Sequence, residues 1–369
     1  MPAVIGIVAD RWIPAQKMLG ICHLVAAVFM ILTAWYGATA EGGVDFATIF
    51  SLYSLSVAFY MPTIALSNSV AYTALCQAGM DTVKDFPPIR VFGTVGFILT
   101  MWFVDIMGFQ TNHWQFVTSA VIGIVLFLYS FTLPQCPVAK GDEHRSLSEA
   151  FGLQAFTLFR QKQMALFFIF SMLLGSSLQI TNGYANPFIS SFASEPEFAD
   201  TFGVQHANIL ISLSQISETL CILLIPFCMK RFGIKNVMLI SMLAWVLRFG
   251  LFSVGDPGSG VWMFILSMIV YGVAFDFFNV SGSLFVDQNT APEIRSSAQG
   301  LFMLMTNGIG GTIGVIAAQQ IINAYTHGMK IGDQFYTVGE WSTCWFIFSA
   351  YALVVGLVFA LVFHPQKLK

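Results

Sequence analysis

Pairs of polar side chains lie inside stretches of the chain that are otherwise apolar. Gln179 and Asn182 are three residues apart, and Gln215 and Glu218 repeat this spacing in the next apolar stretch. Residues at this spacing share one face of a helix, so each pair directs two polar groups to the same side. Amide and carboxyl groups together donate to and accept from hydroxyl groups, and such a face therefore fits a polar, uncharged ligand.

A further apolar stretch places a second carboxyl group among aromatic rings. Asp276 and Asn279 are again three residues apart, and Phe275 is one of three phenylalanines within two positions of Asp276. An aromatic face can stack on a flat ring of a ligand, while a buried carboxyl group can exchange a proton as its surroundings change. We expect Asp276 to carry the proton and Glu218 to bind mainly hydroxyl groups; the reverse assignment is the alternative.

The first half of the chain contributes one polar stripe. Arg90, Thr94 and Phe97 are spaced four and three residues apart, just after a Pro-Pro pair that begins the helix, and so share one face. Amides, one guanidinium, two acids and aromatic rings together suit a nucleoside better than a nucleotide, because no cluster of Lys or Arg is present to bind phosphate. Arg90 alternatively lies at the membrane interface and only adds to the positive charge of that side.

Each of these polar groups also has a structural interpretation. Gln179 and Asn182 are alternatively hydrogen-bonded to neighbouring helices. Glu218 and Asp276 are alternatively ion-paired with Arg248, which lies inside a predicted span, and proton coupling would then not follow. The phenylalanines near Asp276 are alternatively packing or lipid-facing side chains, since the chain contains 37 phenylalanines.

The composition is that of an all-α integral membrane protein. Of 369 residues, 56% are hydrophobic and 9% are charged, whereas soluble domains contain about 25% charged residues. The mean hydropathy is +0.75. A helix of roughly 20 apolar residues crosses the hydrocarbon core. The apolar runs predict ten such helices, near 18–38, 46–72, 88–106, 113–133, 163–190, 205–229, 235–254, 261–285, 297–323 and 341–363.

The distribution of positive charge predicts the orientation. When loops are assigned alternately to the two sides, one side receives fourteen of the 16 Lys and Arg residues, the other receives Lys330, and Arg248 lies within a span. Cytoplasmic loops are enriched in Lys and Arg, so the side with fourteen, which includes the C-terminus, is predicted to be cytoplasmic. Its basic residues are Arg11, Lys17, Lys84, Arg90, Lys140, Arg145, Arg160, Lys162, Lys230, Arg231, Lys235, Arg295, Lys367 and Lys369.

A polar segment divides the chain into two bundles. Residues 134–162 are expected to form a cytoplasmic linker between an N-terminal bundle, 1–133, and a C-terminal six-helix bundle, 163–369. Short basic turns at 6–11 and 230–235 occupy equivalent places in the two halves, and two parallel repeats of six helices are the architecture of major facilitators. By this symmetry, residues 1–9 are expected to be the stub of a cut helix, with one complete helix missing before it.

Other classes of protein fit the sequence poorly. The net charge is −3, and the absence of a long basic tract argues against a nucleic-acid partner. The six cysteines show neither CxxC nor Cys/His spacing, so no metal or redox centre is expected. The chain also lacks HExxH, G-x-S-x-G and nucleophilic Cys/His arrangements, and we therefore expect no enzyme activity and no cofactor.

The sequence resembles the bacterial nucleoside:proton symporter family of the major facilitator superfamily. The similarity extends over essentially the whole chain and includes the motifs PPIRVFGTVGF, LQITN, QISE and AFDFFN. In that family the nucleoside binds in a central cavity between the two bundles. The positions that match the cavity motifs are Arg90, Thr94, Phe97, Gln179, Asn182, Gln215, Glu218, Phe275 and Asp276.

The resemblance implies proton-coupled nucleoside uptake across the bacterial inner membrane by alternating access. The expected partners are a purine or pyrimidine nucleoside, protons and the lipid bilayer, and the expected functional unit is a monomer. Two alternatives remain open: a facilitator of another polar neutral solute such as a sugar, and a membrane receptor or scaffold that has this fold without transporting. Sodium coupling is also open.

Overall fold

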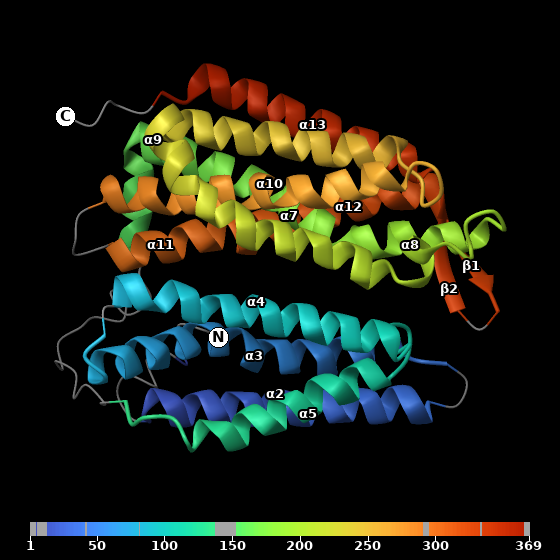
Figure 1. The fold of residues 1–369 in the computed structure, drawn as a ribbon, viewed down its shortest axis with the longest axis horizontal. Helices are drawn as coiled ribbons and strands as arrows, with labels where there is room; N and C mark the ends of the chain where they lie inside the picture. The colour runs from blue at the N-terminus through green and yellow to red at the C-terminus, as the bar shows by residue number, and fades with distance from the viewer. Residues whose placement is uncertain are drawn as a thin grey trace. The chain divides into compact units, whose positions relative to one another are not determined.

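The computed structural model describes residues 5, 13–40, 43–80, 82–136, 153–290, 295–332 and 334–364. These residues belong to two compact helical units, residues 1–151 and 152–369, which are coloured blue to green and green to red in Figure 1. The predicted basic turn at 6–11 and most of the predicted linker lie outside the described residues.

The first unit contains four long helices. They are α2 (Ala15–Thr39), α3 (Phe46–Gln77), α4 (Thr82–Ile106) and α5 (Trp114–Ser130), and α2 packs against both α3 and α5. Asp45 begins α3, since its carboxylate accepts hydrogen bonds from the backbone N–H of Thr48 at 2.9 Å and from its hydroxyl at 2.7 Å. Ser56 joins α3 to α2 by donating to the Ala26 carbonyl at 2.8 Å.

The second unit contains both long helices and short helical elements. The main ones are α7 (Lys162–Ser191), α9 (Ala207–Val254), α10 (Val261–Gln288), α11 (Arg295–Met303), the π-helix η4 (Leu304–Gly310), α12 (Gly311–Tyr325) and α13 (Trp341–Val362). The short elements are η1 (Leu153–Arg160), η2 (Phe192–Ser194) and α8 (Phe202–Gln205). Gly233 interrupts α9 with a φ of 73°, a backbone conformation that glycine adopts without steric cost. As a result, α9 consists of two helices joined by a sharp bend.

The helices agree with the ten predicted spans. In the described part of the chain, eight helical segments are long and apolar enough to cross a membrane, and two shorter apolar helices run over Val91–Ile106 and Trp114–Ser130. The bend at Gly233 separates the sixth and seventh predicted spans, and α11, η4 and α12 together form the ninth. Between the ninth and tenth predicted spans, the structure contains an antiparallel hairpin of β1 (Thr326–Ile331) and β2 (Gln334–Gly339). The residues of this hairpin are mostly exposed, and each strand is too short to give a clear alternation of apolar and polar residues in the sequence.

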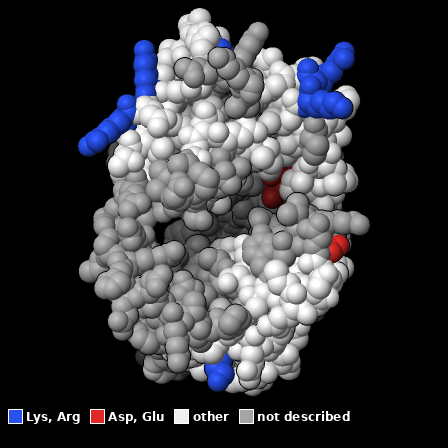
Figure 2. Space-filling model, turned by 90° about the vertical axis from the view of Figure 1, so that its left-hand side faces the viewer, with Lys and Arg blue, Asp and Glu red and all other residues white. Residues whose placement is uncertain are grey.

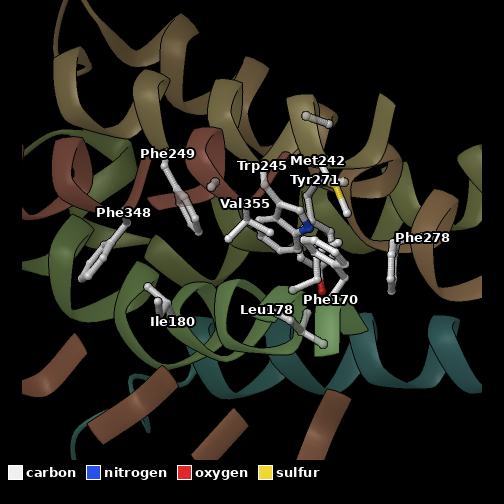
Figure 3. Close-up of a cluster of buried hydrophobic side chains, with 14 of the residues drawn as sticks. Phe170, Leu178, Ile180, Met242, Trp245, Phe249, Tyr271, Phe278, Phe348 and Val355 are labelled. Carbon is white, nitrogen blue, oxygen red and sulfur yellow. The ribbon is translucent and has the colours of Figure 1, made fainter. Parts of the chain in front are cut away.

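The core of the second unit is rich in aromatic side chains. Trp345, Phe249 and Phe188 are almost fully buried, and the rings of Phe249 and Trp345 stack with their centroids 5.7 Å apart. Figure 3 shows part of this cluster between the helices. Interlocking rings of this kind stabilise contacts between helices through close packing, and they fix the helices that carry the polar pairs.

Two glycines bring α7 into backbone contact with the segment formed by η4 and α12. A side chain on Gly175 would collide with the Thr306 carbonyl, and one on Gly310 would collide with the Met172 carbonyl. Ser176 adds a hydrogen bond from its hydroxyl to the Gly310 carbonyl at 2.8 Å. Small residues at helix contacts allow backbones to approach closely inside a membrane. The π-helix is therefore held tightly against α7.

Candidate functional site

The first polar pair lies on α7. Gln179 is half-buried and Asn182 is exposed, and the Gln179 side chain lies against Gly311 of α12, where an added Cβ would be 2.8 Å from its Cγ. Within the described residues, neither amide makes a side-chain hydrogen bond. An amide that joins two helices would use its hydrogen-bonding groups on the neighbour. Both amides therefore have donors and acceptors that no described residue uses.

The second polar pair lies on the first part of α9. Gln215 and Glu218 are both half-buried, whereas Ser217 between them is buried and donates a hydrogen bond to the Ile269 carbonyl of α10. Ser214 lies one turn earlier and donates to the Met268 sulfur at 3.0 Å. The serines therefore attach α9 to α10, and the adjoining helix face presents Gln215 and Glu218.

The third group lies on α10. Asp276 is buried, with 3% of its surface exposed, and Phe275 is half-buried. The ring of Phe275 stacks on that of Tyr271, with centroids 5.9 Å apart and an angle of 17° between the planes. Glu218 follows Ser217 on α9, and Ser217 packs against the backbone of Gly272 on α10, four residues before Asp276. The contact of α9 with α10 thus brings together the segments that carry both candidate proton carriers.

Arg248 is a fully buried cation in the same unit. It donates to the Ser267 carbonyl at 2.7 Å and to the Thr181 hydroxyl at 3.3 Å, and its guanidinium carbon lies 4.6 Å from the centre of the Tyr271 ring. Its second ring contact is with Phe252, at 5.1 Å. In the part of the chain that the structure describes, the contacts of Arg248 are with neutral groups, so the geometry does not favour the ion pair with Glu218 and Asp276.

A small cavity lies beside these groups. It has a volume of about 30 Å³ and is bounded by α7, α9, α10 and η4, with Phe275, Asn279, Trp245 and Asn307 among its lining residues. This space accommodates one small polar group rather than a whole nucleoside, since a single water occupies about 30 Å³ of the liquid.

Three candidate residues belong to the first unit, on α4. Thr94 is half-buried and Phe97 is 54% exposed, and the glycines at 93 and 96 leave open space around the helix. The backbone of Arg90 is helical, and its side chain lies outside the described residues. Helical spacing places Thr94 and Phe97 on one face, as predicted. The other six candidates, on α7, α9 and α10, lie in the second unit.

Charged side chains are sparse on the face that Figure 2 shows. Among its described residues, a few Lys and Arg side chains and fewer Asp and Glu side chains are visible. Among the described residues, no three His, Cys, Asp or Glu side chains gather as a metal site would require. The six cysteines are free thiols.

Sequence reasoning did not select Tyr271, Trp245 or Asn307 as site residues. Tyr271 precedes Phe275 by four positions, a spacing that predicts a shared helix face. Asn307 lies within TNGIG, where several glycines follow it, but the sequence does not reveal that this run forms a π-helix. Trp245 carries no sequence signal beyond its type, since only packing brings it to the cavity.

Comparison with known proteins gives matches along the whole chain. Residues 1–368 match the family described as nucleoside H+ symporter. The nucleoside permease NupG of Escherichia coli (strain K12) is 48% identical over 370 residues, which cover 100% of this chain and 85% of the relative. The xanthosine permease of the same organism is 46% identical over 375 residues, which cover 100% of this chain and 86% of the relative.

Solved structures agree with this relationship. A crystal structure of the nucleoside transporter NupG superposes with a TM-score of 0.86 at 46% identity, covering 99% of this chain and 87% of that one. The xylose transporter XylE from E. coli gives a TM-score of 0.54 at 14% identity, covering 99% of this chain and 85% of that one, and at this identity the likeness concerns the fold alone. The helical architecture expected from the sequence is thereby confirmed.

Proposed function

Because this chain belongs to the nucleoside H+ symporter family, we propose that it takes up nucleosides together with protons, by alternating access of a site within the membrane. The chain is a multi-pass membrane transporter with a major facilitator fold, and it is not an enzyme. The observation that carries the proposal is the full-length family match, and the polar groups of α7, α9 and α10 supply chemistry that suits the substrate.

The proposed substrate contacts are the residues that match the cavity motifs of the family. The amides of Gln179, Asn182 and Gln215 bind hydroxyl groups or base edges, because their hydrogen-bonding groups are not used within the described part of the protein. Phe275 stacks on the base. Arg90, Thr94 and Phe97 add contacts from α4, as the family resemblance implies.

The proposed proton site is the pair of acids Glu218 and Asp276 on the adjoining helices α9 and α10. Asp276 carries the proton and Glu218 mainly binds substrate hydroxyls, since Asp276 is buried whereas Glu218 is half-buried beside Gln215. A buried acid in a span is costly, so its presence indicates a functional role. Protonation of Asp276 would neutralise its negative charge while the transporter changes from outward-facing to inward-facing.

The proposed location is the bacterial cytoplasmic membrane, with the C-terminus in the cytoplasm and a monomer as the functional unit. The asymmetry of Lys and Arg between alternate loops supports this orientation. Within the second unit, the bend at Gly233 follows the basic pair Lys230 and Arg231, so this turn is placed on the cytoplasmic side.

Transport into liposomes tests the proposal. Purified protein is reconstituted, an inward proton gradient is imposed, and uptake of labelled uridine is measured with and without a protonophore. We expect saturable uptake that exceeds equilibrium only with the gradient. Unlabelled adenosine should compete and unlabelled xylose or glucose should not.

Three outcomes would contradict the proposal. Competition by sugars but not nucleosides would indicate a sugar facilitator. Accumulation that depends on a sodium gradient instead of a proton gradient would show that the coupling ion is sodium. An absence of any binding or uptake by folded protein would favour a receptor or scaffold.

A further inference from the structure

Asn279 and Asn307 face one cavity from two different helical elements. Asn279 lies on α10, four residues after Phe275 and therefore on the same helix face. Asn307 lies in η4, and both asparagines line the cavity of about 30 Å³ together with Phe275. Leu178, Trp245 and Phe278, which also line the cavity, belong to the buried part of the second unit shown in Figure 3.

The hydrogen-bonding groups of these amides are largely unused. Within the described residues, Asn279 makes no side-chain hydrogen bond, although it is half-buried in a span. The NH₂ group of Asn307 has a weak acceptor, the Met303 sulfur at 3.5 Å. Polar side chains inside the membrane are retained where they bind a partner. Asn279 is half-buried and Asn307 is exposed, so both amides have donors and acceptors to offer a polar group that enters the cavity.

The π-helix explains how Asn307 reaches the cavity. A π-turn has one residue more than an α-turn, so it rotates the following side chains by about 100° relative to a continuous α-helix. Thr306, beside Asn307, also lines the cavity and donates from its hydroxyl to the Phe302 carbonyl at 2.9 Å. The close contacts of Gly175 and Gly310 then hold this turn against α7. Such π-helical turns occur frequently at functional sites.

The walls of the cavity indicate which part of a substrate would enter. Phe275, Phe278 and Trp245 offer aromatic surface, and the amides add paired donors and acceptors. Asparagine amides match the donor and acceptor pattern on the edge of a nucleobase, as in their pairing with adenine. A ribose offers hydroxyl groups but no flat apolar face. The volume fits the polar edge of a base whose ring stacks on Phe275.

We infer that Asn279 and Asn307 form a base-reading subsite that determines which nucleosides this transporter prefers. The inference rests on the proposed function, and it adds two residues to the predicted substrate contacts. Phe275 connects the two parts of the site, since it is both a predicted stacking residue and a wall of the cavity.

The test compares inhibition constants for labelled uridine binding by purified Asn279→Ala and Asn307→Ala proteins. One competitor series varies the base (uridine, cytidine, adenosine and inosine), and the other varies the sugar (2′-deoxyuridine and 3′-deoxyuridine). We expect each variant to bind its preferred base about 2- to 13-fold more weakly, as loss of one hydrogen bond implies. The ratios of the inhibition constants for nucleosides with different bases should move toward one. The ratios of the inhibition constants within the sugar series should stay as in the wild type.

The control is Asn236→Ala, since Asn236 is an exposed asparagine on α9 that bonds only within its own helix, to the Phe232 carbonyl at 2.9 Å. A cooperative thermal unfolding transition shows that a variant is folded. If an Ala variant does not fold, Asn279→Ser or Asn307→Ser replaces it in the test. Unchanged base ratios in folded variants, or altered sugar ratios instead, would overturn the inference. Failure of the proposed function is distinguishable, because the wild type itself would then bind no nucleoside.

Discussion

At the scale of single residues, the second unit contains amides without a side-chain hydrogen bond among the described residues. They are Gln179, Asn182 and Gln215, whereas Asn186, on the same helix α7 as Gln179 and Asn182, bonds Asn208 at 2.7 Å. Bonded and unbonded amides thus occur on one helix. Burial and spacing alone do not distinguish them, and the position of the neighbouring helix does.

The first prediction concerns Gln179→Ala and Asn182→Ala. Each should weaken nucleoside binding about 2- to 13-fold, because a hydrogen bond between neutral groups contributes about 0.5 to 1.5 kcal/mol. Calorimetry on the purified variants measures the change. Gln288→Ala, at the exposed end of α10, is the matched control. Wild-type affinity in both variants would show that these amides have a structural role.

The second prediction assigns the proton. Asp276→Asn should abolish uptake driven by a pH gradient but retain nucleoside binding and exchange of labelled for unlabelled substrate, because the amide preserves the shape of the side chain and does not titrate. Paired assays of accumulation and counterflow in liposomes separate the two activities. If the variant still accumulates nucleoside, the carrier is another group, and Glu218→Gln becomes the variant to measure.

At the scale of secondary-structure elements, Arg248 connects the helices of the site. Its side chain leaves α9, bonds Thr181 on α7, and bonds the Ser267 carbonyl on α10. It also lies over the Tyr271 ring, which stacks on Phe275. One fully buried side chain thus positions three helices that carry candidate residues.

The third prediction follows from these contacts. Arg248→Ala should lower the free energy of unfolding of the detergent-solubilised protein by about 2 to 5 kcal/mol. A large buried side chain is removed, and its partners lose their hydrogen bonds. Arg248→Lys should recover only part of the loss, because an ammonium group lacks the planar fork that reaches several partners. Thermal unfolding measures the stability of both variants and the wild type. Equal stability of Arg248→Lys and the wild type would contradict the role of the guanidinium in joining the three helices.

The contact of α7 with η4 gives the fourth prediction. Gly310→Ala should destabilise the protein by about 1 to 3 kcal/mol, because the new methyl group would collide with the Met172 carbonyl. Gly300→Ala on α11 is the matched control, since a Cβ there would meet open space, and it should be neutral or slightly stabilising. Thermal unfolding distinguishes the two variants. Similar midpoints for both would show that the backbones of α7 and η4 can move apart without loss of stability.

At the scale of the whole molecule, the described residues form two helical units with few charged side chains inside the spans. Only 9% of the residues in the chain are charged, and Arg248 and Asp276 are buried within spans. The hairpin β1–β2 carries Lys330, which lies over the Phe335 ring at 5.8 Å. Lys330 is also the one basic residue assigned by loop alternation to the side opposite the other loop charges.

The fifth prediction tests that topology. With the natural cysteines replaced, Lys330→Cys should react with a membrane-impermeant thiol reagent added to intact cells, because the hairpin is predicted to face outward. Lys230→Cys, an exposed position beside the bend of α9, should react only after the cells are permeabilised. Labelling in the opposite pattern would reverse the orientation derived from the positive charges.

The membrane class, the positions of ten helices and the family can be predicted from the sequence alone. Apolar runs long enough to cross a bilayer leave the backbone few alternatives to helix, because every N–H and C=O must be satisfied internally. Spacing within one helix is equally local, which is why Gln179 with Asn182 and Gln215 with Glu218 could be paired from sequence.

Packing between helices settles which groups from different helices meet. Nothing local to the chain indicates that Arg248 bonds neutral partners, that its guanidinium lies over the Tyr271 ring, or that Asn307 of η4 lines a cavity with residues of α10. These contacts depend on how closely two helices approach and how each is rotated about its axis. Close packing at small residues such as Gly310 determines both, and it acts between segments far apart in sequence.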